Sequence, residues 1–395
     1  MQERPKDQHH SGDDEGERLR ALQMLLFCVF TAMTGLGVVS PIMPNYATSL
    51  GATGIWLGLI YSGFSFTRAV LQTPIGRLAD RRSKKKILCI GLGVYALVSL
   101  LYIYASSPLH LVAIRLVHGV GSAMVMPVAM AYAVELTPKG KEGRYMGYMS
   151  TAMFTGFGAG PLLGGYIYDW FSLSAVFYSM TALVSVSLLL TLIFVPEERS
   201  IRGVRRPTVP FTKILSNRRL LGAMIYRIIN ALGRGSIMGF LALFAVQTLG
   251  ISYSLVGTIL SVGIFANSFL QTPFGILADK YNRVLLIVIG SILSSFGYFY
   301  LAKTGGALDL MMARLVISVG SGLAIPAMTA IVAEEGRRMG AGSTMGVLNT
   351  GMSLGQIAGS LLTGLIMDIY DIQTAFILGG VLGLISTVIF YILVR

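Results

Sequence analysis

The chain of 395 residues is 54% hydrophobic and only 12% charged, and its formal net charge is +13. Soluble globular proteins carry about 25% charged residues. A soluble fold of this length could not bury so much apolar surface and is therefore excluded. The basic residues gather in a few short segments between apolar runs, which argues against a nucleic-acid partner in spite of the net charge.

The first residues, 1–20, are polar and mixed in charge, and we expect them to form a disordered cytoplasmic tail. Twelve apolar runs follow, each of about 20 residues, the length that crosses a bilayer as a helix. Six runs fall in 21–195 and six in 220–395, with a basic cytoplasmic linker at 196–219 between these two domains. The predicted spans lie near 22–44, 53–75, 87–106, 108–135, 146–168, 173–195, 220–247, 252–275, 284–303, 308–333, 344–366 and 372–394.

Most of the 31 Lys and Arg residues lie in the tail, in the linker and in alternate loops, whereas the intervening loops contain almost none. This asymmetry is the positive-inside bias, and it predicts that both termini are cytoplasmic. We therefore expect an integral, multi-pass protein of the cell membrane (inner or plasma). Its basic loops would contact the anionic heads of the lipid bilayer.

A ten-residue segment occurs twice in the chain. LQTPIGRLAD at 71–80 returns 199 positions later as LQTPFGILAD at 270–279, with eight of the ten residues identical. The register continues without a gap, so that Arg115 corresponds to Arg314. In a strongly apolar chain, two parallel repeats are typical of a secondary transporter whose substrate site lies between the halves.

Each copy of the repeated segment ends where a predicted helix turns into a basic loop. Both copies share a glycine, an aspartate four residues later and then a basic residue: Gly76, Asp80 and Arg81, and Gly275, Asp279 and Lys280. The glycine would allow close helix contact. The aspartate could accept hydrogen bonds from helix ends or pair with nearby cations. The doubled pattern is too specific for an ordinary basic loop.

Polar residues at helical spacing predict a cavity. Arg115, His118 and Ser122 share one face of the run at 108–135. An arginine at membrane depth costs about 2.5–3.5 kcal/mol and normally faces a cavity or a partner. An arginine tied to backbone carbonyls and a purely structural histidine are the alternatives. The candidates for the substrate or proton pathway are Arg68, Arg115, His118, Arg227, Asn230, Arg234, Arg314, Asn349 and Gln356.

The run at 146–168 contains the pattern G-x8-G-x3-G-P-x-x-G-G, formed by Gly147, Gly156, Gly160, Pro161, Gly164 and Gly165. Small residues let helices pack closely, and a proline removes a backbone hydrogen bond and bends a helix. The second half has Ser360 at the position of the proline. This difference indicates that the bend matters in the first half, although ordinary glycine packing is the alternative.

The loop after the second predicted span resembles the motif Gly-x-x-x-Asp-Arg/Lys-x-Gly-Arg/Lys-Arg/Lys of the major facilitator superfamily, and departs from it at Ser83. The glycine pattern resembles that of the 12-helix drug:proton antiporters in this superfamily. The resemblance implies an all-α membrane protein with 12 transmembrane helices in two pseudo-symmetric six-helix bundles. It also implies alternating access, protons as the coupling ion, a small-molecule substrate and a monomer.

The same resemblance implies a conformational latch that closes the cytoplasmic side and breaks when this side opens. Its members would be Asp80, Arg81, Glu135 and Arg144 in the first half, and Asp279, Lys280, Glu334 and either Arg337 or Arg338 in the second. The resemblance also connects Arg115 with proton movement.

Three functions fit the sequence. The first is a proton-coupled efflux antiporter of small amphipathic compounds or drugs. The run at 22–44 contains no carboxylate, unlike that of many proton-coupled exporters, and five arginines lie inside predicted spans. These features favour, as the alternative, a carrier of organic anions or metabolites that works as an exchanger or symporter. The third is a transport-dead sensor or receptor on the same scaffold. We expect no enzyme, cofactor or metal site, because no matching motif is present.

Overall fold

The computed structural model describes residues 8–137, 141–197, 216–339 and 341–394, and all regular elements in these ranges are helices. The first half contains α1 (Gln8–Val38), α2 (Met43–Ser49), α3 (Gly54–Ala79), α4 (Lys84–Leu101), η1 (Tyr102–Tyr104), α5 (Pro108–Leu136), α6 (Glu142–Trp170) and α7 (Leu173–Phe194). The second half contains α9 (Arg218–Leu243), η2 (Phe244–Thr248), α10 (Tyr253–Lys280), α11 (Arg283–Ala302), α12 (Ala307–Met339), α13 (Ala341–Ile369) and α14 (Ile372–Val394).

The helix boundaries follow local signals that the two halves share. Ser83 and Asn282, equivalent positions of the repeat, accept backbone hydrogen bonds at the first turns of α4 and α11, as expected of residues that cap a helix N-terminus. Gly51 and Gly250 occupy equivalent positions of the repeat, before α3 and α10. Their φ angles are 86° and 64°, in a region that glycine adopts readily and other residues avoid.

The amino-terminal segment differs from the prediction. The sequence predicts a disordered tail over 1–20, but α1 begins at Gln8 and runs without interruption into the first span. Extending an existing helix avoids the unfavourable nucleation step, so a polar segment next to a stable span can continue it. Residues 1–7 and most of the predicted linker, 198–215, lie outside the described ranges.

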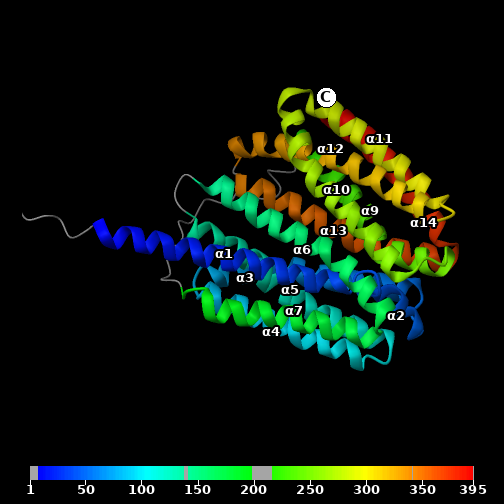
Figure 1. Ribbon diagram of the computed structural model, residues 1–395. Coiled ribbons are helices and arrows are strands. Elements are labelled where there is room, and N and C mark those ends of the chain that lie inside the picture. Colours follow the sequence, from blue (N-terminus) through cyan, green and yellow to red (C-terminus); the bar gives the residue numbers. More distant parts are fainter. Residues whose placement is uncertain (1–7, 138–140, 198–215, 340, 395) are drawn as a thin grey trace, which may run out of the picture.

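The packing of the helices repeats between the two halves. In the first, α1 packs on α6 and α7, and α5 packs on α3 and α4; in the second, α9 packs on α13 and α14, and α12 packs on α10 and α11. Figure 1 shows the two groups of helices, the first in blue to green and the second in yellow-green to red. The prediction of an all-α fold with two six-helix bundles is confirmed.

Eleven of the described helices are long and apolar enough to cross a membrane. The predicted span at 146–168 corresponds to α6, which is 29 residues long but rich in glycine and therefore less hydropathic. Helix α6 lies between α1 of its own half and α10 of the other half. A helix covered by protein on two sides needs less hydrophobicity than one surrounded by lipid.

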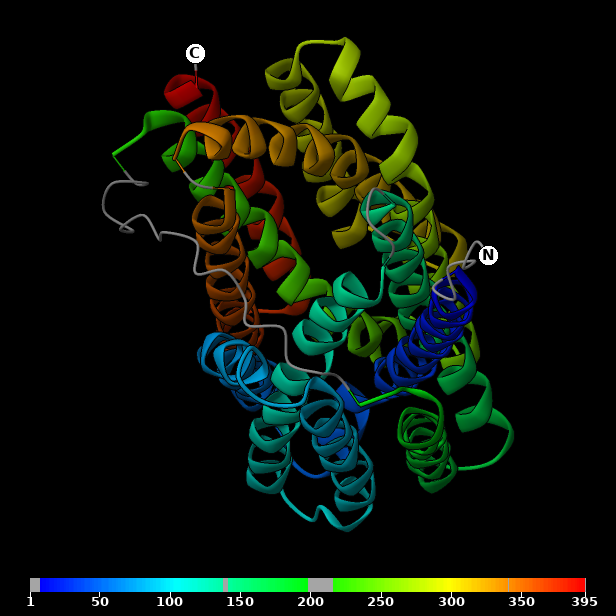
Figure 2. The same ribbon diagram turned by 90° about the vertical axis from the view of Figure 1, so that its left-hand side faces the viewer.

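The molecule has two different ends. We call the end that carries the loops around Arg81 and Arg283 the basic end, and the opposite end, which carries Gly51 and Gly250, the far end. Helix α3 packs on α13 and α6 packs on α10, which joins the two halves. The hydrogen bonds that we find between described residues of the two halves lie at the far end. The halves diverge toward the basic end, which faces the viewer in Figure 2.

Candidate functional site

A cavity lies between the two halves near the middle of the helices. The first half contributes α1, α3, α5 and α6 to its wall, and the second half contributes α9 and α13. Its volume is about 110 Å³, several times the roughly 10–15 Å³ that one water molecule needs. The lining residues are Leu36, Ser40, Tyr61, Phe64, Ser65, Arg68, Arg115, Phe157, Gly235, Met238, Gln356 and Ser360.

Arg115 is the most enclosed charge in this wall. Only 7% of its surface is exposed, and its Cζ lies 5.3, 5.9 and 5.7 Å from the ring centroids of Tyr61, Phe64 and Tyr102. A cation over an aromatic ring gains about 0.5–2 kcal/mol. Its Nε is buried without a hydrogen-bond partner among the described residues. We find no hydrogen bond from Arg115 to a backbone carbonyl among the described residues, so they do not support the alternative of an arginine held by backbone carbonyls.

Arg68 and Gln356 line the same cavity, so the structure brings three of the predicted pathway residues together. Arg68 belongs to the same face of α3 as Tyr61 and Ser65, at helical spacing. The apolar part of the wall consists of Leu36, Phe64, Phe157 and Met238. The cavity is therefore amphipathic, with two guanidinium groups and several neutral polar groups beside aromatic surface.

His118 does not line the cavity. It is buried behind Arg115, and its Nδ1 lies 3.1 Å from the hydroxyl oxygen of Tyr102. The rings of Phe64 and Tyr95 meet the imidazole edge-on. His118 Nε2 has no hydrogen-bond partner among the described residues. The ring of Phe64, which lines the cavity, thus also contacts the imidazole of His118.

Apart from Gln356, the predicted pathway residues of the second half lie outside this wall. Arg227 donates to the sulfur of Met352, and Arg234 donates to Asn230 Oδ1 at 3.2 Å. Arg314 donates to Ser318 Oγ at 3.1 Å. Asn349 is exposed nearer the basic end of α13. No carboxylate pairs with these arginines among the described residues, just as none pairs with Arg115.

Two aspartates at equivalent positions of the repeat join the halves at the far end. Asp368, at the end of α13, accepts hydrogen bonds from the backbone N–H groups of Gly54 (2.5 Å) and Ile55 (2.8 Å), at the start of α3. Asp169, at the end of α6, accepts one from the N–H of Ser254 (2.7 Å), at the start of α10. Each carboxylate thus caps the positive N-terminus of a helix in the opposite half.

The glycine pattern of α6 supports two different contacts. Gly156, Gly160 and Gly164 lie against the backbone of α1, where a side chain would meet Phe30, Gly37 and Val38. Gly165 faces the Tyr253 backbone of α10, in the opposite half. Pro161 lies against both Gly37 and Gly257. No atom beyond its own helix turn lies within 4 Å of a side chain placed at Gly147, so this member of the pattern makes no close helix contact.

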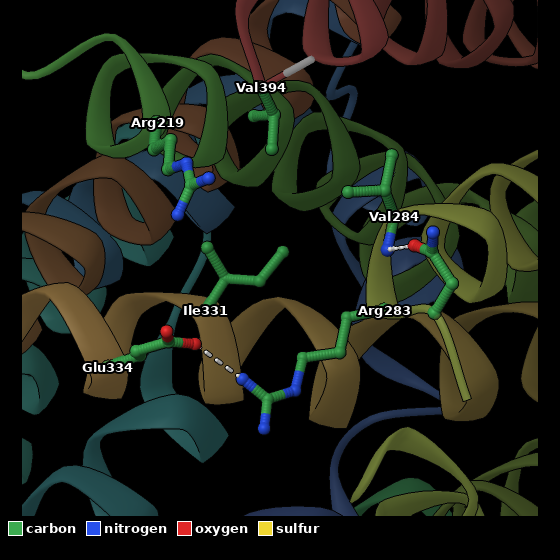
Figure 3. A pocket seen from close by; sticks show the side chains of 7 residues that line it. Arg219, Arg283, Val284, Ile331, Glu334 and Val394 are labelled. Atoms are coloured by element: carbon green, nitrogen blue, oxygen red, sulfur yellow. Dashed lines mark hydrogen bonds and ion pairs between the residues drawn. The ribbon is translucent and has the colours of Figure 1, made fainter. Parts of the chain in front are cut away.

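The predicted latch residues pair differently from the prediction. Glu135 binds Lys84 at 2.6 Å, and Glu334 binds Arg283 at 2.8 Å; these are the same pair in the two repeats. Figure 3 shows the second pair in a small pocket that Arg219 and Ile331 also line. The sequence prediction missed Lys84 and Arg283 as partners, although both follow the repeated aspartate by four residues.

The remaining members of the predicted latch do not form a cluster in this state. Arg144 donates to the Tyr148 hydroxyl at 2.8 Å, and the exposed side chains of Asp80, Arg81 and Lys280 have no ion-pair partner among the described residues. Asp279 lies 4.0 Å from Arg283. No atom lies within 4 Å of a side chain placed at Gly76. The physical reason is that the expected partners are occupied by other residues: Glu135 binds Lys84, and Arg144 binds the Tyr148 hydroxyl. The gating role stays a prediction.

Comparison with known proteins gives a consistent result. The sequence profile of the Major Facilitator Superfamily matches residues 25–229 and 223–395. An uncharacterized transporter of this type from Methanocaldococcus jannaschii is 30% identical over 369 residues, 92% of this chain and 95% of its own. Multidrug resistance protein 1 of Bacillus subtilis is 26% identical over 365 residues, 90% of this chain and 91% of its own.

A solved structure has the same fold. A mutant of the nucleoside transporter NupG superposes with a TM-score of 0.83 at 14% identity, covering 95% of this chain and 100% of its own.

Proposed function

Because the chain belongs to the Major Facilitator Superfamily, we propose that it is a secondary transporter that exports small amphipathic compounds by alternating access, coupled to protons. The observation that carries this proposal is the cavity between the two halves, which presents charged, neutral polar and aromatic groups together. Such a wall suits a molecule with both a polar group and an apolar body. The similarity to a multidrug resistance protein supports the same substrate range.

The positive-inside bias supports a cytoplasmic position for the basic end. In this orientation the two halves are bonded to each other on the outer side and diverge toward the cytoplasm, the arrangement in which an exporter would receive its substrate. The two halves then rock about the cavity, so that the far end opens and the basic end closes. Substrate or proton binding drives this change through its different affinity for the two states.

For the coupling proton we propose His118, a titratable side chain next to the cavity wall. Histidine is the side chain that ordinarily changes charge between pH 5 and 8, and His118 lies directly behind Arg115, hydrogen-bonded to Tyr102. No Asp or Glu is found among the residues that line the cavity. We therefore place the coupling proton at His118. In the variant His118→Gln, downhill substrate exchange should persist while a pH gradient no longer drives accumulation.

Transport in proteoliposomes tests the proposal. Purified protein is reconstituted, a pH gradient is imposed, and accumulation of a panel of cationic, neutral and anionic amphipathic compounds is measured. Accumulation that depends on the gradient and disappears with a protonophore is the expected result. Failure to move any member of the panel, in either direction and with either gradient, would exclude a transporter of this substrate range.

A further inference from the structure

The cavity contains positive charge without a protein counter-charge. Arg115 is 93% enclosed, its guanidinium lies over the rings of Tyr61, Phe64 and Tyr102, and it forms no ion pair with a described residue. Arg68 adds a second guanidinium to the same wall. Carboxylates are not available nearby, since the acidic residues of the described ranges lie at helix ends and in loops.

An uncompensated charge in such a site is unfavourable. Burying a charge away from water requires a partner of opposite sign or strong hydrogen bonds, and removing one partner of a buried pair typically costs about 3–5 kcal/mol. Aromatic rings attract the guanidinium but leave its charge in place, and each contributes less than a full ion pair. A binding site of this kind gains most from a ligand that supplies the missing negative charge.

The rest of the cavity wall indicates which chemical groups a negatively charged ligand should carry besides its charge. Phe64, Phe157 and Met238 provide an apolar surface next to the arginines, and Gln356 offers an amide that can donate or accept. A small inorganic anion would leave this apolar surface without a partner. A lipophilic cation would fill the apolar surface but face repulsion from two guanidinium groups at low effective dielectric.

We propose that the substrate is an amphipathic organic anion, a carboxylate or sulfonate carried on an apolar, preferably aromatic body. Its acidic group binds Arg115 and Arg68, and its body lies along Phe64, Phe157 and Met238. Guanidinium groups recognise carboxylates with paired, charge-assisted hydrogen bonds. This inference rests on the proposed function, because it takes the cavity to be the transport site, and it specifies the substrate class of that site.

Binding to three ligands of the same shape and different charge tests the substrate class. We would titrate naphthalene-2-carboxylate, its neutral amide and 2-naphthylmethylammonium into the protein in lipid nanodiscs, with empty nanodiscs as the blank, by calorimetry. The carboxylate should bind at least tenfold more tightly than the amide, and the ammonium should bind most weakly. Equal affinities, a preference for the ammonium, or no binding of any of the three would overturn the proposal.

Variants test whether the arginines cause the preference. Arg115→Gln should weaken carboxylate binding at least tenfold and leave the amide unchanged, and Arg115→Lys should fall between Arg115→Gln and the natural protein. Arg68→Gln provides the same readout if Arg115→Gln does not fold. Arg82→Gln is the matched control, since Arg82 is an exposed arginine outside the cavity. Loss of amide and carboxylate binding in parallel would show a structural role instead.

The result separates this inference from the proposed function. Charge-selective binding without transport in proteoliposomes would sustain the substrate class of the cavity and overturn the exporter. Gradient-driven transport of amphipathic cations, together with absent carboxylate binding, would sustain the exporter and overturn the substrate class proposed for the cavity.

Discussion

The repeated ion pair at the basic end differs in burial between the two halves. The side chains of Lys84 and Glu135 are 5% and 28% exposed, whereas those of Arg283 and Glu334 are 29% and 51% exposed. Water screens the second pair, and surface pairs contribute about 0–1 kcal/mol. The first pair is more enclosed, is screened less by water and should contribute more.

We therefore predict that Glu135→Gln lowers the apparent melting temperature of the purified protein more than Glu334→Gln does. The expected loss is about 1–3 kcal/mol for Glu135→Gln and below about 1 kcal/mol for Glu334→Gln. Thermal unfolding of both variants in the same detergent measures the difference. An equal or larger loss in Glu334→Gln would contradict the role of burial.

Part of the site could be predicted residue by residue. Arg68, Arg115 and Gln356 line the cavity because polar residues at helical spacing in an apolar run have few other favourable positions. Phe64, Phe157 and Met238 could not be recognised, since an apolar residue facing a cavity and one facing lipid look alike in the sequence. His118 shares a helix face with Arg115, but aromatic rings that come from other helices cover it.

At the scale of elements, the glycines of α6 and the helix N-termini of α3 and α10 hold the far end closed. A cross-link reports this closure: Thr48 and Gln247 belong to different halves, and the Gln247 side-chain amide donates to the Thr48 hydroxyl at 3.0 Å. With Cys28 and Cys89 replaced by serine, the pair Thr48→Cys and Gln247→Cys should react with a short bifunctional thiol reagent when the far end is closed.

Gly165→Ala should reduce this cross-linking. The added methyl group would collide with the backbone carbonyl of Tyr253 in α10, and overpacking typically costs about 1–3 kcal/mol. A free-energy cost of about 1.4 kcal/mol corresponds to a factor of ten in an equilibrium. The initial rate of cross-linking should therefore fall about tenfold. Gly147→Ala is the control in the same helix, because nothing lies within 4 Å of its new methyl group. Similar cross-linking rates in Gly165→Ala and Gly147→Ala would show that the contact of Gly165 with α10 does not stabilise the closed far end.

Asp368→Asn should weaken the same closure through charge. The carboxylate caps the N-terminus of α3 in the opposite half, and such interactions contribute about 0.3–1 kcal/mol, up to about 2 kcal/mol when partly buried. We expect a two- to tenfold lower cross-linking rate. Asp371→Asn is the control, because the Asp371 carboxylate accepts a hydrogen bond from the N–H of Thr374 within its own half, at 2.6 Å. This hydrogen bond holds the pKa of the Asp371 carboxyl below its usual value. An equal effect of both substitutions would argue against a specific far-end contact.

At the scale of the whole molecule, the sequence repeat predicts the architecture but not the state. The 199-residue register indicates two equivalent bundles, and the helix contacts repeat accordingly. Both open and closed arrangements satisfy the same hydrophobic pattern. The pairing of Asp169 and Asp368 across the halves depends on the state, so no local signal in the sequence could assign it.

The two ends of the molecule should act on one equilibrium. If the region around Asp80 holds the basic end closed in the opposite state, Asp80→Asn favours the state described here, in which that side chain is exposed without an ion-pair partner among the described residues. Asp80→Asn should then slow transport strongly while membrane insertion stays normal, and the Thr48–Gln247 cross-link should form at least as fast as in the natural protein.

Combining Asp80→Asn with Asp368→Asn tests whether the ends are coupled. One substitution favours the far-end-closed state and the other disfavours it, so their free energies oppose each other in a two-state equilibrium. We expect the double variant to cross-link more slowly than Asp80→Asn alone and to regain part of the transport rate in proteoliposomes. Natural transport rates in Asp80→Asn would exclude the latch. A double variant slower in transport than either single variant would show that the two ends act independently, because independent defects accumulate while opposing shifts of one equilibrium cancel.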